Sequence, residues 1–323
     1  MAEFSIIERF CKNLGASHSE TRLAVGDDAA VIAIPENMEL AISADTMVEG
    51  VHFFADTDPA LLAHKILAVN LSDMAAMGAE PKWATLALTL PELNEQWIKQ
   101  FSDSLNSLAE AYGVQIIGGD TTQGPLNLCI NIMGLLPKGK SLTRANAKVG
   151  DDLYVSNHLG DAALALNCLD QGLQFKGMDL ELLRKSLDTP IPQVDLGQNL
   201  LDIASACLDI SDGLIADLGH IAKQSRVSFE IDIEQLPLSD QYHQYVSDGG
   251  NVDLALSGGD DYQLAFTASP NSHEQINVLS ETLDTRLSRI GRVVDENDNA
   301  VSLFADGRPY TLKNKSGYEH FNG

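Results

Sequence analysis

The sequence predicts an α+β fold of two domains, each a mixed β-sheet with helices packed on it. The chain has 323 residues and 44% hydrophobic content, which is enough for two domains with cores of their own. Strand-like and helical runs occur in both halves without strict βαβ alternation. A polar, locally basic segment at 138–150 predicts a junction between an N-terminal domain, 1–137, and a C-terminal domain, 151–323.

The clearest element of the N-terminal half is a helix from Asp58 to Met77. Asp58 suits the N-cap, Pro59 suits the first helical position, and Gly78 can end the helix. Asp73 falls on or beside the apolar face, which is a costly place for a charge without a partner. The other elements expected here are strands at 29–34, 39–44, 83–90, 114–117 and 126–136 and a helix at 94–112.

The C-terminal half mixes short strands with amphipathic helices. Its expected strands are 152–156, 206–210, 227–233, 252–256, 261–267, 287–294 and 300–304. Its expected helices are 161–171, 179–187, 195–205, 212–224, 239–247 and 272–284.

Composition excludes several classes of function. A net charge of −25, from 21 Lys and Arg against 46 Asp and Glu, argues against binding to nucleic acid or to an anionic membrane surface. No apolar run approaches the roughly 20 residues that span a bilayer, and the N-terminus lacks a signal-peptide pattern. The four cysteines are widely spaced, which favours reduced thiols and a cytoplasmic location; they are Cys11, Cys129, Cys168 and Cys207.

Aspartates recur in short clusters with glycine or serine, mostly near the ends of strand-like runs. The clusters are Gly26-Asp27-Asp28, Ser43-Ala44-Asp45-Thr46, Ser72-Asp73, Gly118-Gly119-Asp120-Thr121, Asp209-Ile210-Ser211-Asp212-Gly213 and Ser257-Gly258-Gly259-Asp260-Asp261. If these carboxylates converge, a cation must offset their repulsion, and hard oxygen ligands favour Mg²⁺. Small neighbours leave room for phosphate oxygens. The pattern predicts a phosphoryl-transfer enzyme that uses several Mg²⁺ ions.

Each cluster also has a structural interpretation. Gly150-Asp151-Asp152 is most simply a turn that opens the second domain. Asp212 could be a metal ligand or only the N-cap of the helix that follows it, whereas Asp209 lies inside a strand. The N-terminus of that helix could face a phosphate together with Ser211. Arg144 could bind ATP phosphates or be a solvated charge of the junction.

Taken together, these segments resemble the thiamine-monophosphate kinase family, which belongs to the ATP-binding superfamily of aminoimidazole ribonucleotide synthetase. The resemblance runs from Gly26-Asp27-Asp28 to Gly317-Tyr318-Glu319. Asn70-Leu71-Ser72-Asp73 and Gly118-Gly119-Asp120-Thr121-Thr122, with their flanks, carry it most specifically. It implies an aminoimidazole ribonucleotide synthetase-like fold and transfer of the γ-phosphoryl group of ATP to thiamine monophosphate.

The resemblance also implies roles for individual residues. The implied Mg²⁺ ligands are Asp28, Ser43, Ala44 through its carbonyl, Asp45, Asp73, Asp120, Asp209 and Asp212, with Asp27 as a further candidate. The implied ATP contacts are Gly119, Asp120, Arg144 and Ser211, and the implied contacts to thiamine monophosphate are His52, Asp260 and Tyr318. The resemblance further implies a homodimer joined through the N-terminal domains, with the nucleotide site in a cleft near that interface. Some relatives carry Glu at the positions of Asp260 and Gln263.

Two other functions remain open from the residues alone. The chain could be another ATP-dependent member of the superfamily, such as a synthetase that phosphorylates an amide or carbonyl oxygen. It could also be a non-catalytic, acidic cation-binding protein, although it lacks an EF-hand loop.

Overall fold

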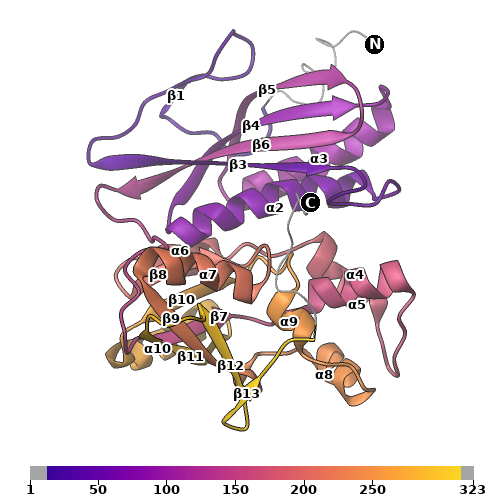
Figure 1. Ribbon diagram of the computed structural model, residues 1–323. Helices are drawn as coiled ribbons and strands as arrows, with labels where there is room; N and C mark the ends of the chain where they lie inside the picture. The colour runs from indigo at the N-terminus through magenta and orange to yellow at the C-terminus, as the bar shows by residue number, and fades with distance from the viewer. Residues whose placement is uncertain (1–12, 314–323) are drawn as a thin grey trace. The chain divides into compact units, whose positions relative to one another are not determined.

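The computed structural model describes residues 13–313 and divides the chain into two compact units (Figure 1). One unit comprises 1–74 and 79–141, and the other comprises 75–78 and 142–323. The main division therefore falls between Ser141 and Leu142, inside the segment 138–150. Each unit combines a mixed sheet with helices, which confirms the α+β prediction.

The described part of the N-terminal unit contains a four-stranded sheet in the order β3-β6-β4-β5. The strands are β3 (Met38–Val48), β4 (Glu80–Leu90), β5 (Gln115–Gln123) and β6 (Asn127–Pro137). Only the β4–β5 pair is parallel. The helices α2 (Pro59–Met77) and α3 (Glu95–Ala111) cover one face of the sheet (Figure 1). The predicted strand at 29–34 is reduced to β2 (Val31–Ile32), which pairs with β1 (Thr21–Leu23).

The side-chain alternation of β3 separates its residues between the two faces of the sheet. Gly134 lies opposite Ala41 in β6, and a Cβ atom at Gly134 would meet the sulfur of Met74 in α2. The odd-numbered residues of β3, including Ser43 and Asp45, therefore point toward the helices. The even-numbered residues lie on the other face, where Ile42 is 65% exposed.

Helix α2 has the ends that its sequence predicts. Asp58 Oδ1 accepts the backbone N–H of Ala60 at 2.8 Å, and Gly78 after the helix has a positive φ of 71°. Within 13–313, α2 is also the one helix long and apolar enough to cross a membrane. The window that meets this criterion is 72% buried within the protein, which is the pattern of a core helix.

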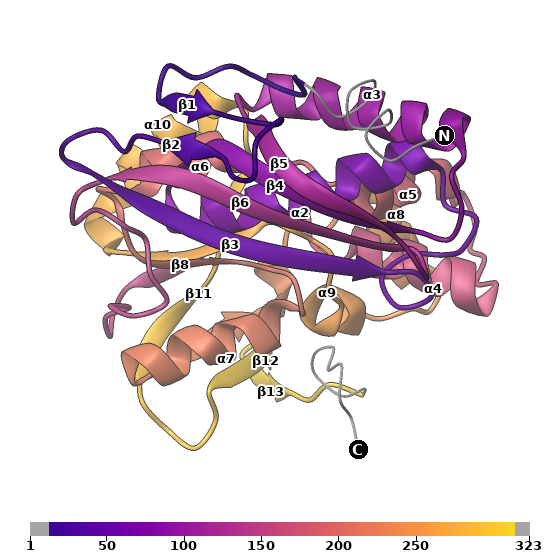
Figure 2. The same cartoon turned by 90° about the horizontal axis from the view of Figure 1, so that it is seen from above.

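The described part of the C-terminal unit contains a seven-stranded sheet in the order β13-β12-β9-β11-β7-β10-β8. The strands are β7 (Asp152–Ser156), β8 (Ala204–Asp209), β9 (Val227–Asp232), β10 (Leu264–Ala268), β11 (Leu287–Asp295), β12 (Val301–Ala305) and β13 (Arg308–Tyr310). The helices are α4 (Asp161–Gln171), α5 (Leu180–Asp188), α6 (Val194–Leu200), α7 (Leu214–Ser225), α8 (Asp240–Ser247), α9 (Asp253–Ser257) and α10 (His273–Leu283). Helix α7 contacts β8, β9 and β12 (Figure 2).

One predicted element of this unit is wrong, and one predicted helix is shorter in the structure. The predicted strand at 252–256 is the helix α9, and the predicted helix at 195–205 ends at Leu200 before β8 begins. Local polar groups explain α9, because Asn251 Oδ1 accepts the N–H of Asp253 at 2.9 Å. The Asp253 carboxylate then accepts the Tyr310 hydroxyl at 2.6 Å from a distant strand.

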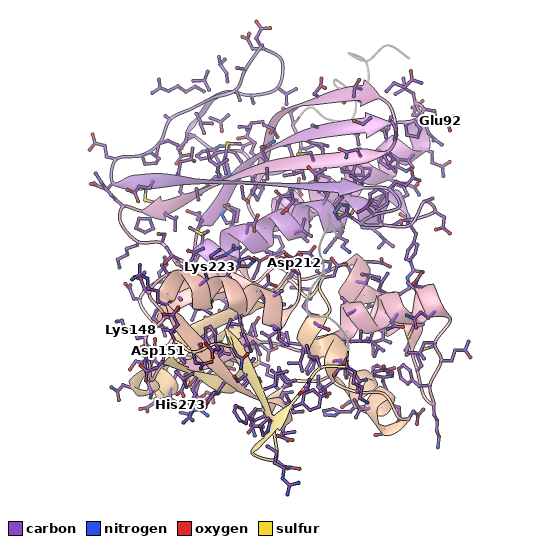
Figure 3. The ribbon with its side chains drawn as sticks, viewed as in Figure 1. Glu92, Lys148, Asp151, Asp212, Lys223 and His273 are labelled. Carbon is purple, nitrogen blue, oxygen red and sulfur yellow. The ribbon has the colours of Figure 1, made fainter. Side chains whose placement is uncertain are left out.

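The Gly150-Asp151-Asp152 segment has a structural role. Gly150 has a φ of 91° and lies in a turn. The backbone N–H of Asp151 closes this turn by donating to Lys148 O at 2.9 Å. The Asp151 carboxylate is buried and accepts the N–H of Lys148 at 3.0 Å and the Ser205 hydroxyl at 2.5 Å. Lys148 and Asp151 lie together in Figure 3, at the beginning of β8.

Candidate functional site

The first group of predicted site residues lies where β3 meets α2. The Ser43 hydroxyl donates a hydrogen bond to Asp73 Oδ2 at 2.5 Å. Asp45 follows two residues later on the same face of β3, and its side chain interacts with that of Asp73. The structure thus brings three of the predicted metal ligands together from two elements.

Asn70 joins this group although the sequence did not mark it as a ligand. Its side chain is fully buried, its Oδ1 accepts the N–H of Asp45 at 3.3 Å, and its Nδ2 donates to Ile66 O at 2.8 Å. Asn70 therefore links β3 to α2 and fixes the backbone at Asp45. A polar residue at a core-facing helical position is the signal that could have identified it.

The electrostatics of this group favour a bound cation. Burial raises the pKa of Asp45 to about 7, and the negative charge of Asp73 adds to the effect. Two carboxylates this close share a proton at neutral pH unless a cation replaces it. The Ser43 hydroxyl and the two carboxylates are hard oxygen donors, so the residues present fit Mg²⁺.

His52 lies just after β3. Its ring Nδ1 accepts the backbone N–H of Val48 at 3.0 Å, and the backbone N–H of His52 donates to Val48 O at 2.9 Å. Because Nδ1 is an acceptor, the neutral ring carries its proton on Nε2. This arrangement orients the ring of a predicted substrate contact.

The remaining candidates of the N-terminal unit are dispersed. Asp27 and Asp28 are exposed in the loop before β2, where the Asp28 N–H donates to Asp27 Oδ1 at 2.9 Å. Ala44 is exposed on the face opposite Ser43 and Asp45. No hydrogen bond in the described part of the chain joins Asp27 or Asp28 to the Ser43–Asp73 pair.

Asp120 lies at the other edge of the sheet from Asp45. Its row of the sheet runs through Ala87 and Cys129 to Thr46, so its side chain is on the face that the helices leave uncovered. Three inter-strand steps separate β3 from β5, which places the Asp45 and Asp120 backbones roughly 14 Å apart. One protomer therefore cannot bring both carboxylates to one metal ion.

Gly119 has a structural reason to be glycine. Its φ is 157°, and a Cβ atom there would lie 1.9 Å from Leu86 O in the neighbouring strand. The close approach of β4 and β5 therefore excludes a side chain, independently of any nucleotide.

The second group of predicted site residues lies at the end of β8 in the C-terminal unit. Asp209 ends β8, where it is 6% exposed, and it pairs with Leu264 at the start of β10. The loops after β8 and before β10 bond to each other, because Asp260 N–H donates to Ser211 O at 2.9 Å and Tyr262 N–H donates to Ile210 O at 2.8 Å. The structure thus brings Asp209, Ser211, Asp212 and Asp260 into adjacent loop segments.

The loop before β10 is conformationally strained. Asp260 and Tyr262 have positive φ angles of 67° and 48°, which side-chain-bearing residues seldom adopt. The Tyr262 hydroxyl donates to Asp260 Oδ1 at 3.0 Å and orients that carboxylate. Gln263 accepts hydrogen bonds from Ser156 at 2.8 Å and Asn157 at 3.0 Å, so it is part of the supporting structure.

The start of α7 differs from the sequence prediction in one respect. Gly213 is the N-cap, with a φ of 114°, and Asp212 is not. Asp217 in the first turns of the helix accepts the N–H groups of Ser211, Asp212 and Gly213 on Oδ2 at 3.0, 3.1 and 3.1 Å. These donors are therefore bonded to a carboxylate of the same chain, and a phosphate contact at Ser211 must use its hydroxyl.

Arg144 and Tyr318 complete the predicted contacts. Arg144 is exposed, and its segment lies along β8, since Cys207 N–H donates to Thr143 O at 3.0 Å and the Ser225 hydroxyl donates to Arg144 O at 3.0 Å. Tyr318 lies outside the described residues. Within 13–313, no group of three or more His, Cys, Asp and Glu side chains is placed to hold a metal ion.

Comparison with known proteins shows the class of protein to which the chain belongs. Residues 26–135 match the N-terminal domain of AIR synthase related proteins, and residues 148–303 match the C-terminal domain. The chain is 46% identical to "Thiamine-monophosphate kinase" of Salmonella typhimurium over 320 residues, covering 99% of this chain and 98% of that one. The chain belongs to the thiamine-monophosphate kinase family.

Solved structures of this family have the same fold. The structure of thiamine-monophosphate kinase from Stenotrophomonas maltophilia K279a is similar with a TM-score of 0.85 and 42% identity, covering 96% of this chain and 98% of that one. The structure of AaThiL complexed with AMPPCP and TMP is similar with a TM-score of 0.77 and 30% identity, covering 90% of this chain and 89% of that one.

Proposed function

We propose that this protein transfers the γ-phosphoryl group of ATP to thiamine monophosphate and so forms thiamine diphosphate and ADP. The observation that carries the proposal is the near full-length identity to thiamine-monophosphate kinases, one of which forms a complex with an ATP analogue and TMP. The contact of Ser43, Asp45 and Asp73 supplies the local chemistry, because oxygen ligands suited to Mg²⁺ are held together there.

The acceptor explains why a general base is not needed. A phosphate monoester is already an anion at neutral pH, so its oxygen can attack the γ-phosphorus without losing a proton to the protein. The barrier then comes from bringing two polyanions together and from the charge on the transferring group.

Residues of both units would supply the electrostatic part of catalysis. Ser43, Asp45 and Asp73 in the N-terminal unit, and Asp209 and Asp212 in the C-terminal unit, would hold Mg²⁺, with Asp28, Asp120 and the Ala44 carbonyl as further ligands. Bound Mg²⁺ supplies positive charge that offsets the repulsion between the two substrates. Arg144 and the Ser211 hydroxyl would contact ATP phosphates, with Gly119 and Asp120 as further ATP contacts.

Substrate contacts are proposed for residues that the fold orients. His52 would donate from Nε2 to the monophosphate, because Nδ1 is occupied by the Val48 N–H. Asp260, oriented by the Tyr262 hydroxyl, would accept a hydrogen bond or contact the cationic thiamine ring. Tyr318 is proposed from the family resemblance alone.

A homodimer joined through the N-terminal units is part of the proposal. The uncovered face of the four-stranded sheet carries Ile42 at 65% exposure and the small residues Ala44 and Ala87. A second copy on this face would bury these groups and would place Asp120 at the interface. We expect Ile42→Asp to convert dimer to monomer in sedimentation, whereas Leu93→Asp, at a residue exposed to 52% outside the sheet, should leave the dimer intact.

We further propose that residues 1–137 form the ATP- and Mg²⁺-binding domain and residues 151–323 the second domain, with 138–150 as the junction. A cytoplasmic location fits the free thiols of Cys129, Cys168 and Cys207. The acidic net charge supports the absence of nucleic-acid and membrane partners.

Product analysis tests the function directly. The purified protein would be mixed with ATP, Mg²⁺ and thiamine monophosphate, with free thiamine in a parallel reaction. We expect thiamine diphosphate and ADP from the monophosphate alone. ATP consumption without thiamine diphosphate would indicate another activity of the superfamily, and Ca²⁺ binding without any ATP consumption would indicate a cation-binding protein.

A further inference from the structure

Asp217 is a buried carboxylate that the proposed reaction does not use directly. It is 3% exposed and projects from α7 back over the beginning of its own helix. One of its oxygens, Oδ2, accepts the N–H groups of Ser211, Asp212 and Gly213. Three consecutive backbone donors converging on one oxygen hold the loop in a single conformation, which an ordinary N-cap with one bond does not do.

The loop that Asp217 holds follows one proposed ligand and contains two more. Asp209 ends the strand before the loop, and Ser211 and Asp212 lie within it. The same loop accepts the Asp260 N–H through Ser211 O at 2.9 Å. Fixing the backbone at 211–213 therefore also fixes the position of Asp260, a proposed substrate contact.

Asp217 is buried, where a negative charge is energetically costly, so we expect its carboxylate to have a specific role. Its side chain is 3% exposed, and a buried carboxylate costs free energy that hydrogen bonds must offset. A helix start could be capped by a serine or by Gly213 alone at lower cost. The Asp217 side chain lies one turn into the helix and reaches back to all three N–H donors.

We propose that Asp217 is a positioning residue, whose hydrogen bonds to the backbone of 211–213 hold Asp209, Ser211 and Asp212 in the arrangement that binds Mg²⁺ and nucleotide. The proposal rests on the roles assigned above to those three residues. It gives Asp217 no contact with substrate or metal. Its effect should therefore appear as a weaker response to Mg²⁺ and nucleotide, over and above any loss of stability.

The matched control is Asp151, a second buried carboxylate of the same unit. It is 5% exposed and also accepts a backbone N–H and a further donor, but it lies at the beginning of β8, whereas the loop 211–213 follows the end of β8 (Figure 3). Asp151→Ala therefore measures the cost of losing a buried capping carboxylate far along the chain from the proposed ligands Asp209, Ser211 and Asp212.

The experiment compares Asp217→Ala, Asp217→Asn and Asp151→Ala in the full chain. The readouts are the Mg²⁺ concentration that gives half the maximal thermal shift with AMPPCP, and kcat and KM for ATP well below each melting temperature. We expect Asp217→Ala to raise that Mg²⁺ concentration by about tenfold, a typical effect of losing a residue that supports ligands. Asp217→Asn keeps an acceptor oxygen and should restore most of the response, and Asp151→Ala should lower only the melting temperature.

Opposite results overturn the proposal in distinguishable ways. An unchanged Mg²⁺ requirement in Asp217→Ala, or equal impairment in Asp217→Asn and Asp217→Ala, would show that Asp217 does not act through these hydrogen bonds. Asp209→Asn serves as the test of the underlying site: if it leaves the Mg²⁺ response unchanged, the assigned ligands are wrong rather than the role of Asp217.

A measurement on the unmodified protein remains decisive if Asp217→Ala does not fold. Hydrogen exchange of the backbone amides of Ser211, Asp212 and Gly213 should be slow in the absence of Mg²⁺ and nucleotide, because Asp217 already accepts all three. Fast exchange at these amides would contradict the proposal.

Discussion

Asp73 and Ser43 lie on different elements, α2 and β3, and their side chains meet at 2.5 Å. The contact explains how an aspartate can occupy a position on the core-facing side of an apolar helix. The sheet supplies a hydroxyl donor, and Asn70 one turn earlier on α2 fixes the β3 backbone at Asp45.

We expect Asp73→Asn to lower turnover by more than about tenfold, because it removes a proposed Mg²⁺ ligand while keeping the shape of the side chain. The melting temperature without Mg²⁺ should stay the same or rise, since one of two adjacent carboxylates has been removed. Asp103→Asn on the exposed side of α3, where Asp103 pairs only with Lys99, is the control and should be nearly silent. Wild-type turnover of Asp73→Asn at saturating Mg²⁺ would refute the ligand role.

The stability of the metal-free protein should depend on pH through Asp45. Its pKa is raised to about 7 in the fold, against about 3.9 in an unfolded chain. Asp45 therefore contributes fully to stability below about pH 4, where it is protonated in both the folded and the unfolded chain. This contribution is lost as the pH rises through about 7, because the buried carboxyl must then ionise. We expect the melting temperature of the wild type to fall relative to that of Asp45→Asn over this range.

Mg²⁺ should reverse this trend, because it binds the carboxylate form and competes with the proton. The Mg²⁺ concentration needed for half the maximal thermal shift should therefore increase as the pH is lowered below about 7. Identical pH profiles of the wild type and Asp45→Asn, without Mg²⁺, would count against the buried carboxylate pair.

We expect Asp151→Asn to cost about 1–3 kcal/mol of stability, because the Lys148 N–H and the Ser205 hydroxyl both donate to Oδ2 of a buried carboxylate, and hydrogen bonds to a neutral amide oxygen are weaker than those to a carboxylate. Its kcat and KM, measured below the melting temperature, should match the wild type. Chemical denaturation gives the first quantity and steady-state assays give the second. A large loss of kcat in a stably folded variant would place Asp151 in the active site.

Gly119→Ala should destabilise the N-terminal unit strongly, because the new Cβ would lie 1.9 Å from Leu86 O and force β4 and β5 apart. Gly219→Ala in α7 is the matched control, since nothing lies within 4 Å of its Cβ position. That control should stabilise the protein by about 0.5–1 kcal/mol through helix propensity. Equal melting temperatures of Gly119→Ala and the wild type would mean that the strands can separate without cost.

The sequence was sufficient for elements with strong local signals. Asp58, Pro59 and Gly78 predicted both ends of α2, and the structure confirms them. The run at 252–256 is predicted as a strand because five residues, four of them apolar, are too few to distinguish the period of a strand from that of a helix. Besides the local bond from the Asp253 N–H to Asn251, the start of this helix is held by Tyr310 and Lys313, about 60 positions away along the chain, which donate to the Asp253 carboxylate.

The candidate site shows the same difference between local signals and long-range contacts. Motif recognition selected Asp45 and Asp73, but their contact depends on how β3 and α2 pack, which no local pattern encodes. The sequence does not indicate Asp217, because its partners are the backbone N–H groups of 211–213. Every residue other than proline has such a group, so no residue type marks the contact. The strand order β3-β6-β4-β5, which separates Asp45 from Asp120, likewise follows from long-range pairing.

The occupied N–H groups at the start of α7 have a consequence for inhibitor design. An inhibitor with a phosphate mimic aimed at this helix terminus would have to displace a carboxylate tethered to the same helix, not water. Such a competitor is always present at the site, so an anionic group placed there should add little affinity. If Ser211 and Asp260 have the proposed roles, inhibitors would gain more from groups that reach the hydroxyl of Ser211 and the Tyr262–Asp260 pair.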